Sequence, residues 1–280
     1  MSTTVTKQTD KTPTTGSKGG TSKSKKSKPV YVDRTLGCRY ELKYLISEAQ
    51  AVAISEFIRP YMPLDRYSKL QPQGYYPIVS LYIDSEDLIL CKESLSGKKN
   101  RYKLRIRSYS DDTQYPTFFE IKRRISSVIM KSRAPARHQD VDRLLRGLSL
   151  PQQDFRTNRE ALNQFQMYAS SVMAGPMVLI RYMRKAYESE SENRVRITFD
   201  RELCYKITKE PRVSLNGSGW QQNAITLQGV ILEIKFTARY PVWLSRLVTT
   251  FDLKSRSISK FATSIQQSCD LGFCGPTLDR

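Results

Sequence analysis

A triplet of a glutamate, an apolar residue and a lysine recurs three times in this sequence, each time where charged and apolar residues alternate. The triplets are Glu41-Leu42-Lys43, Glu120-Ile121-Lys122 and Glu233-Ile234-Lys235. Residues two apart on a β-strand point to the same face, so each triplet places a carboxylate beside an ammonium group. The middle residue points to the opposite face. The pattern therefore predicts strands with one ionic face and one apolar face.

Two further stretches carry cations at the same alternating positions. Lys103-Leu104-Arg105-Ile106-Arg107 places three cations on one face, and Arg194-Val195-Arg196 places two. Like charges at this spacing repel unless an anion lies between them. A single charged face is usually exposed to solvent, but five such faces are harder to explain in that way, and if all of them turned inward a closed barrel with a hydrophilic interior would result. Its cations would bind a chain of phosphates and its carboxylates a divalent metal ion.

The composition agrees with an anionic ligand. The chain has 46 Lys and Arg against 27 Asp and Glu, a formal net charge of +19. Residues 1–29, with seven Lys and one Asp, carry +6 of this charge, which leaves +13 on residues 30–280. A folded domain this basic is typical of proteins that bind nucleic acid, anionic lipid or phosphorylated small molecules. Net charge alone does not choose among these ligands.

The N-terminal residues differ in composition from the rest. Residues 1–29 are mainly Ser, Thr, Lys and Gly, with too little apolar surface to offset the entropy of ordering. We expect a disordered basic tail there and a single domain over residues 30–280. No apolar run approaches the ~20 residues that cross a bilayer, and no signal-peptide core is present. With five scattered cysteines, best explained as reduced thiols, this favours a cytoplasmic protein without a transmembrane segment.

The hydrophobic pattern along residues 30–280 predicts more strands than helices. Strands are expected at 39–46, 78–84, 101–109, 117–124, 128–133, 177–187, 194–199 and 230–237. Helices are expected from a cap at Ser47 to Arg59, and at 140–148, 154–173, 242–251 and 259–269. The two kinds do not alternate regularly, which favours an α+β fold with a large antiparallel sheet over a doubly wound parallel fold.

An ordered series of motifs between Arg39 and Phe261 resembles the catalytic domain of the VTC (vacuolar transporter chaperone) polyphosphate polymerases, within the triphosphate tunnel metalloenzyme superfamily. The motifs are Arg39-Tyr-Glu-Leu-Lys-Tyr44, Val79-Ser-Leu-Tyr-Ile-Asp84, Arg105-Ile-Arg-Ser-Tyr109, Phe119-Glu-Ile-Lys122, Tyr182-Met-Arg-Lys-Ala-Tyr187, Arg194-Val-Arg-Ile-Thr-Phe-Asp200, Leu232-Glu-Ile-Lys235 and Ser259-Lys-Phe261. The resemblance implies a closed antiparallel β-tunnel of about eight strands with peripheral helices, which binds nucleoside triphosphate and polyphosphate.

The resemblance also implies roles for particular residues. The catalytic, phosphate-gripping cations of the family correspond to Lys43, Arg105, Arg107, Lys122, Arg184 and Arg196. The substrate-binding residues correspond to Lys131, Tyr182 and Lys260. Glu233 matches the glutamate that holds Mn²⁺, for which Mg²⁺ is the alternative. In one departure from the family pattern, Ser257 stands where a second lysine is often found, and Lys254 or Arg256 would have to replace it.

The activity implied is that of a polyphosphate polymerase, which transfers the γ-phosphate of ATP to a growing inorganic polyphosphate chain. Two alternatives stay open. The same tunnel with water as the nucleophile would be a triphosphatase or polyphosphatase. Without turnover it would be a module that binds polyphosphate or an inositol polyphosphate, which Ser257 mildly favours. A nucleic-acid partner is not expected, because no standard motif accompanies the charge and the 16 Tyr. A membrane-associated partner protein is left open.

Overall fold

The structure, a computed structural model, describes residues 39–126, 128–149, 158–189, 195–237 and 240–272. All of them belong to one compact unit, residues 35–280. The expected basic tail over residues 1–29 lies outside the described residues, as does Arg194.

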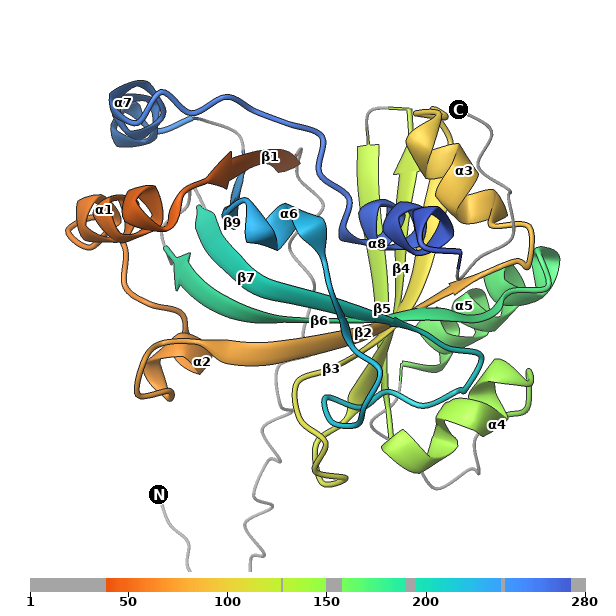
Figure 1. Cartoon of the computed structure of the whole chain (residues 1–280). Coiled ribbons are helices and arrows are strands. Elements are labelled where there is room, and N and C mark those ends of the chain that lie inside the picture. The colour runs from red at the N-terminus through yellow and green to blue at the C-terminus, as the bar shows by residue number, and fades with distance from the viewer. Residues whose placement is uncertain (1–38, 127, 150–157, 190–194, 238–239, 273–280) are drawn as a thin grey trace, which may run out of the picture. The chain divides into compact units, whose positions relative to one another are not determined.

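The described strands form one antiparallel sheet (Figure 1). They follow one another in the order β1-β9-β7-β6-β2-β3-β4-β5, with the short β8 beside β7. Their bounds are β1 Arg39–Ile46, β2 Tyr76–Asp84, β3 Arg101–Ser108, β4 Thr117–Ile125, β5 Val128–Ala136, β6 Gly175–Glu188, β7 Arg196–Ile207, β8 Gln221–Gln222 and β9 Val230–Thr237. Each predicted strand is present.

The two ends of this strand order approach each other. Among the described residues, β1 pairs only with β9 and β5 only with β4. An ion pair nevertheless joins the Lys122 ammonium on β4 to the Glu41 carboxylate on β1, at 3.0 Å. The sheet is therefore curled until its first strand faces the other end of the sheet. The predicted α+β class and antiparallel tunnel are confirmed.

The helices lie between and after these strands. Their bounds are α1 Glu48–Ile58, α2 Arg66–Lys69, α3 Ile89–Leu95, a 3₁₀ turn His138–Asp140, α4 Val141–Leu145, α5 Arg159–Ser171, α6 Ala224–Leu227, α7 Val242–Thr250 and α8 Lys260–Asp270. Ser47 caps α1 as predicted, in a capping box where the Ser47 and Gln50 side chains accept from each other's backbone N–H groups. The short helices α2, α3 and α6 were not predicted.

Strand β7 is longer than the sequence predicted. It continues from Phe199 to Ile207, through three consecutive charged residues, Asp200, Arg201 and Glu202. Glu202 has a φ of 54°, and the register with β6 shifts beside it. This irregularity lets the strand pass the charged stretch and resume its alternation, with Leu203 and Tyr205 buried.

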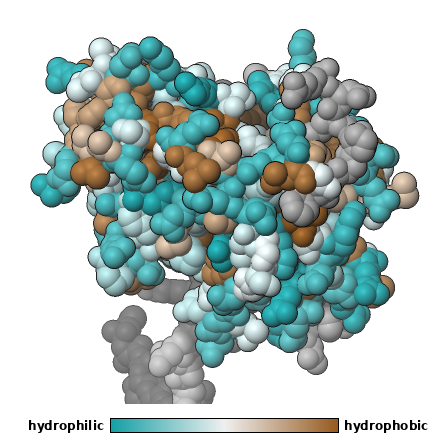
Figure 2. All heavy atoms as spheres, viewed as in Figure 1, coloured by the Kyte–Doolittle hydropathy of each residue, from teal (hydrophilic) through white to brown (hydrophobic). Residues whose placement is uncertain are grey.

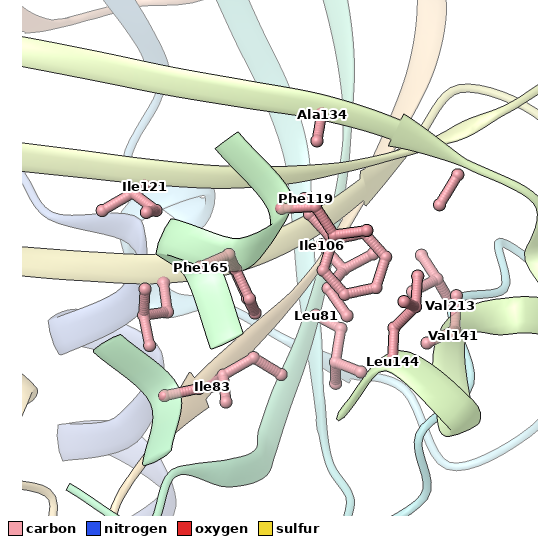
Figure 3. Packing of buried hydrophobic residues seen from close by; sticks show 14 of the residues in the cluster. Leu81, Ile83, Ile106, Phe119, Ile121, Ala134, Val141, Leu144, Phe165 and Val213 are labelled. Carbon is pink, nitrogen blue, oxygen red and sulfur yellow. The ribbon is translucent and has the colours of Figure 1, made fainter. Parts of the chain in front are cut away.

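The outer, apolar face of the sheet is covered by two groups of helices. On one side Phe165 of α5 packs edge-on against Phe119 of β4, with ring centroids 5.0 Å apart, among side chains that include Leu81 and Leu144 (Figure 3). On the other side α1 and α7 cover β1, β9 and β7. Burial of these apolar faces turns the charged residues of the three Glu-apolar-Lys triplets inward, whereas Arg123 of β4 points outward and donates to the Tyr168 hydroxyl of α5.

The inner face of the sheet is covered in part by α8. Phe261 of α8 stacks on Tyr82 of β2 with ring centroids 4.8 Å apart, and Ile265 packs in the same apolar cluster. The segment before α8 lies along β1, where the Arg256 N–H donates to the Lys43 carbonyl at 2.8 Å. An apolar part of the inner face is thus filled by a helix, and the ionic part is left for other contacts.

Among the described residues, no helix is both long and apolar enough to cross a membrane. In the view of Figure 2, hydrophilic side chains cover most of the visible surface, and apolar residues occur in small groups.

Candidate functional site

Glu120 holds three cations on the inner face of β3, β4 and β5. The residue is 1% exposed and stands opposite Arg105 and Arg133 in the strand register. Its carboxylate accepts from Arg105 Nε at 2.7 Å and forms ion pairs with Lys131 at 2.7 Å and Arg133 at 3.4 Å. Burial alone would raise the pKa of Glu120, but these cations and Arg107 hold it well below its usual range. Glu120 is therefore ionised.

Asp200 forms ion pairs with two cations that come from different parts of the chain. It is fully buried on β7 and accepts two hydrogen bonds from the Arg184 guanidinium, at 2.6 and 2.7 Å. Lys260, the first residue of α8, forms an ion pair with the same carboxylate at 2.7 Å. Burial opposes ionisation, but Arg184 and Lys260 lower the pKa of Asp200. The start of α8 is thereby tied to the sheet.

Glu41 and Glu233 lie next to each other among lysines on β1 and β9. Lys43 stands opposite Glu233 in the register and forms an ion pair with Glu41 at 3.1 Å. Lys235 contacts both carboxylates. Burial and Glu233 would raise the pKa of Glu41, but Lys122, Lys235 and Lys43 lower it to about 2. Burial would also raise the pKa of Glu233, but Lys235, Lys43, Lys260 and Arg184 hold it well below its usual range, so both carboxylates are ionised.

Arg196 is held by acidic partners at the border of this network. Its guanidinium pairs with Glu188 and, at 2.8 Å, with Asp65, and it donates to the Tyr76 hydroxyl at 3.3 Å. Asp65 is 5% exposed and also caps α2 by accepting from the Ser68 N–H at 2.8 Å. One carboxylate therefore positions both a cation of the network and the helix beside it.

The inward cations Arg107 and Lys103 form no direct ion pair with a carboxylate within the described residues, although Glu120 is close enough to Arg107 to stabilise its charge. Arg107 is 7% exposed and donates to the Ser80 hydroxyl at 3.1 Å and to the Tyr182 hydroxyl at 3.3 Å. Lys103 donates to the Ser259 hydroxyl at 2.9 Å, and burial, with Lys122 and Lys43 nearby, lowers its pKa to about 8. Buried charges are usually paired, so these two leave the network short of negative charge and suited to an anion.

The structure brings all ten sequence-predicted site residues together. Nine of them belong to this ionic network on the inner face or contact it directly: Lys43, Arg105, Arg107, Lys122, Lys131, Arg184, Glu233, Lys260 and Tyr182, whose hydroxyl accepts from Arg107. Arg196 borders it. Lys254 and Arg256, the two cations nearest Ser257 on its N-terminal side, are both exposed, and Lys254 pairs with Asp252 at 3.3 Å.

A model of a known protein family matches most of this chain. The family model described as the VTC domain matches residues 38–269. The chain belongs to the VTC-domain family. Its curled antiparallel sheet and inward cations make this VTC domain a tunnel-fold protein suited to triphosphate-type ligands. The resemblance inferred from the ordered motifs is confirmed.

This VTC domain was also compared with curated proteins and with solved structures. No curated protein matches it significantly. Similar solved structures include a candidate adenylate cyclase from Bacillus halodurans, at 14% identity and a TM-score of 0.43, with 80% of this chain and 94% of that chain covered. A protein from Pyrococcus horikoshii is 13% identical, with a TM-score of 0.39 and coverages of 82% and 99%.

The donor set of the VTC domain suits a hard divalent cation. The Thr198 hydroxyl is buried without a hydrogen-bond partner, directly opposite Glu233 in the strand register, and Glu41 shares Lys235 with Glu233. Mg²⁺ is commonly held by one or two carboxylates together with substrate phosphate oxygens. In the described parts of the chain no three His, Cys, Asp or Glu side chains gather at one point, so phosphate oxygens would have to complete such a site.

Several members of the network had no individual role assigned from the sequence. Glu41 and Glu120 stand two residues before a lysine, which suggested only a general role for such carboxylates as metal ligands, and Asp200 stands in a recognised motif without a cation at that spacing. Asp65 lies outside every motif. Its only local signal is a helix-capping position three residues before Ser68, which says nothing of its contact with Arg196.

Proposed function

We propose that this VTC domain is a metal-dependent polyphosphate polymerase, which transfers the γ-phosphate of ATP to a growing inorganic polyphosphate chain. The observation that carries the proposal is that Arg107 and Lys103 form no ion pair with a carboxylate among the described residues, while Arg105 lies near Arg107 and Lys43 and Lys122 lie near Lys103. A row of phosphates would supply the missing negative charge.

The reaction requires alignment and charge stabilisation more than proton transfer. A terminal oxygen of polyphosphate forms a bond to the γ-phosphorus of ATP, the bond from that phosphorus to the β,γ-bridging oxygen breaks, and ADP leaves with the bonding electrons. Arg105 and Arg184 are held rigidly by Glu120 and Asp200 and would contact the transferring group without reorganising. Arg107 and Tyr182 would orient the neighbouring phosphate.

Hydrolysis by the same site is less well supported. An attacking water needs a base, and the inward carboxylates Glu41, Glu120, Asp200 and Glu233 all have a lowered pKa. Carboxylates stabilised in the ionised form are weak proton acceptors. A phosphate nucleophile is already anionic and needs no base, which favours the polymerase over the triphosphatase or polyphosphatase.

Glu233, with Glu41 and the Thr198 hydroxyl nearby, would hold a divalent cation such as Mn²⁺ or Mg²⁺. When bound, such an ion would offset charge on the phosphate oxygens. Glu41 and Glu233 keep the charge needed to bind it because the surrounding lysines hold them ionised.

Incubation of the full chain with ATP, Mn²⁺ and a pyrophosphate primer, followed by gel electrophoresis and nucleotide chromatography, tests the proposal. Long polyphosphate together with ADP is the expected result, and omission of Mn²⁺ should abolish both. Free orthophosphate without chains would identify a hydrolase instead. Binding of tripolyphosphate without turnover under Mn²⁺ or Mg²⁺ would identify a non-catalytic binding module.

A further inference from the structure

Four aromatic rings gather beside the ionic network, and the proposed phosphotransfer does not use them. Tyr76 of β2, Tyr109 just after β3, Phe118 of β4 and Tyr67 of α2 form this aromatic cluster. Tyr67 lies parallel to Tyr109, with ring centroids 6.1 Å apart, and 5.7 Å from Tyr76. Tyr109 meets Phe118 edge-on at 6.0 Å. The rings come from four separate elements, so the fold assembles them.

The aromatic cluster is continuous with the phosphate-gripping residues. The Tyr76 hydroxyl accepts from Arg196 at 3.3 Å, and Phe118 stands directly opposite Arg107 in the strand register. The Arg133 guanidinium lies 3.5 Å from the centre of the Phe118 ring and 3.4 Å from the Glu120 carboxylate, so it touches both groups. A ligand could therefore contact the rings while its charged end enters the ionic network.

Tyr67 is the ring of the cluster that is most open to solvent, and the helix that carries it is fixed to the sheet. Tyr67 is 43% exposed, whereas Tyr76 is 6% exposed. The helix that carries Tyr67 is fixed by its Asp65 cap and by Ser68, whose hydroxyl accepts from the Ala186 N–H at 3.0 Å. Arg66 lies over the Tyr67 ring at 4.6 Å, which adds a planar cation to the exposed rim. A half-exposed, positioned ring beside an arginine is a typical stacking platform.

We propose that the aromatic cluster is the nucleobase subsite of this VTC domain, where the base of the nucleoside triphosphate stacks on Tyr67 and Tyr109 while its phosphates enter the ionic network. The inference rests on the proposed function for the presence of a nucleotide. Every base has a π-face, so stacking tolerates different bases. The site should therefore separate nucleotides from inorganic tripolyphosphate and discriminate weakly between ATP and GTP.

Titration calorimetry of the full chain with ATP and with inorganic tripolyphosphate, both in Mn²⁺, tests this subsite. Tyr67→Leu and Tyr109→Leu should each weaken ATP binding about tenfold, the scale of losing one stacked base, and leave tripolyphosphate binding within about twofold. Tyr67→Phe keeps the ring and should bind ATP as the wild type does. Tyr61→Leu is the matched control, because Tyr61 is 46% exposed and stacks on Trp243 among the helices of the outer face.

The outcomes separate this inference from the proposed function. Equal losses for both ligands in Tyr67→Leu and Tyr109→Leu, or no loss for ATP in either, would overturn the nucleobase subsite and leave phosphate binding intact. A wild-type chain that binds neither ligand would overturn both proposals. Thermal unfolding of each variant identifies a folding defect. If a leucine variant is unstable, Tyr67→Phe and Tyr67→Trp are measured in its place. Both variants keep an aromatic ring, so the ratio of ATP affinity to tripolyphosphate affinity should stay as in the wild type.

Discussion

Arginines and lysines occupy the inner face of this sheet in different surroundings. Arg105 and Arg184 have side chains that are 21% and 11% exposed, and each is fixed by a carboxylate that is almost completely buried. Lys122, Lys131 and Lys235 have side chains that are 41%, 43% and 37% exposed. Lys122 and Lys235 share Glu41 with a third lysine, Lys43.

The contrast indicates that the arginines and the lysines have different roles in ligand binding. An arginine keeps its charge at any accessible pH and presents a planar, pre-oriented set of donors, so the arginine part of the network is rigid and insensitive to pH. A lysine is a flexible point charge whose pKa responds to its environment. Burial, with repulsion from neighbouring cations, lowers the pKa of Lys103 and of Lys131 to about 8 in each case, although Tyr82 and Glu120 respectively oppose the change. The lysine part should therefore set how binding varies with conditions.

Substitution of Asp200, the carboxylate that holds Arg184, should have the largest effect on stability. Asp200→Ala leaves the buried Arg184 and Lys260 cations without their carboxylate, which should lower the free energy of unfolding by about 3–5 kcal/mol. Chemical denaturation measures the change. Asp142→Ala, which breaks an exposed pair with Arg146, is the control and should cost no more than about 1 kcal/mol. Equal costs for the two variants would contradict the assignment.

Substitutions that act on the chemistry come next. Arg105→Ala and Glu233→Gln should each lower turnover of ATP at least ~100-fold, the scale of losing one electrostatic stabiliser of the transition state. The initial rate of ADP release measures this. Arg59→Ala alters a side chain that is 76% exposed and should leave the rate unchanged. Near-normal rates in both test variants would refute the site assignment.

Changes of pH should distinguish the two parts of the network. Between pH 7 and pH 9 the Lys103 and Lys131 ammonium groups lose their protons, because the pKa of each is about 8. Fewer cations then face the ligand, so the affinity for tripolyphosphate should fall about tenfold per lysine over this range. Calorimetry at several pH values tests this. Lys103→Arg should make the profile flatter, and an unchanged profile would show that Lys103 does not contact the anion.

The smallest effect is expected at Lys122, a half-buried lysine. Lys122→Met should weaken tripolyphosphate binding only about twofold to fivefold at physiological salt, because the charge is partly screened and Lys43 and Lys235 remain beside Glu41. The difference from the wild type should shrink further as salt is added. A loss as large as that of Arg105→Ala would show that the lysine part is as rigid as the arginine part.

Much of the fold was predictable because its signal is local. The two-residue period of the strands separates Glu41 and Lys43 from Leu42, and it does so wherever the triplet recurs, whatever the rest of the chain does. The sequence also contains the ordered motifs that define the VTC domain, and the ten expected site residues do meet in space. The predicted end of strand β7 at Phe199 was wrong, because the bulge at Glu202 that lets the strand continue depends on pairing with the neighbouring strand β6.

The contacts that decide the chemistry depend on residues far apart in the sequence. Lys122 meets Glu41 across 81 residues, and Arg196 meets Asp65 across 131, and no local pattern could pair them. The apolar packing of α8 on the inner face, the contact of Tyr76 with Arg196 and the lack of a direct ion pair for Arg107 among the described residues arise in the same way. The sequence by itself determined which residues face inward, since alternation along a strand is a property of the backbone. Only the tertiary structure decided which inward cations are neutralised and which are left for a ligand, because charge pairing depends on strand register and on the curl of the whole sheet.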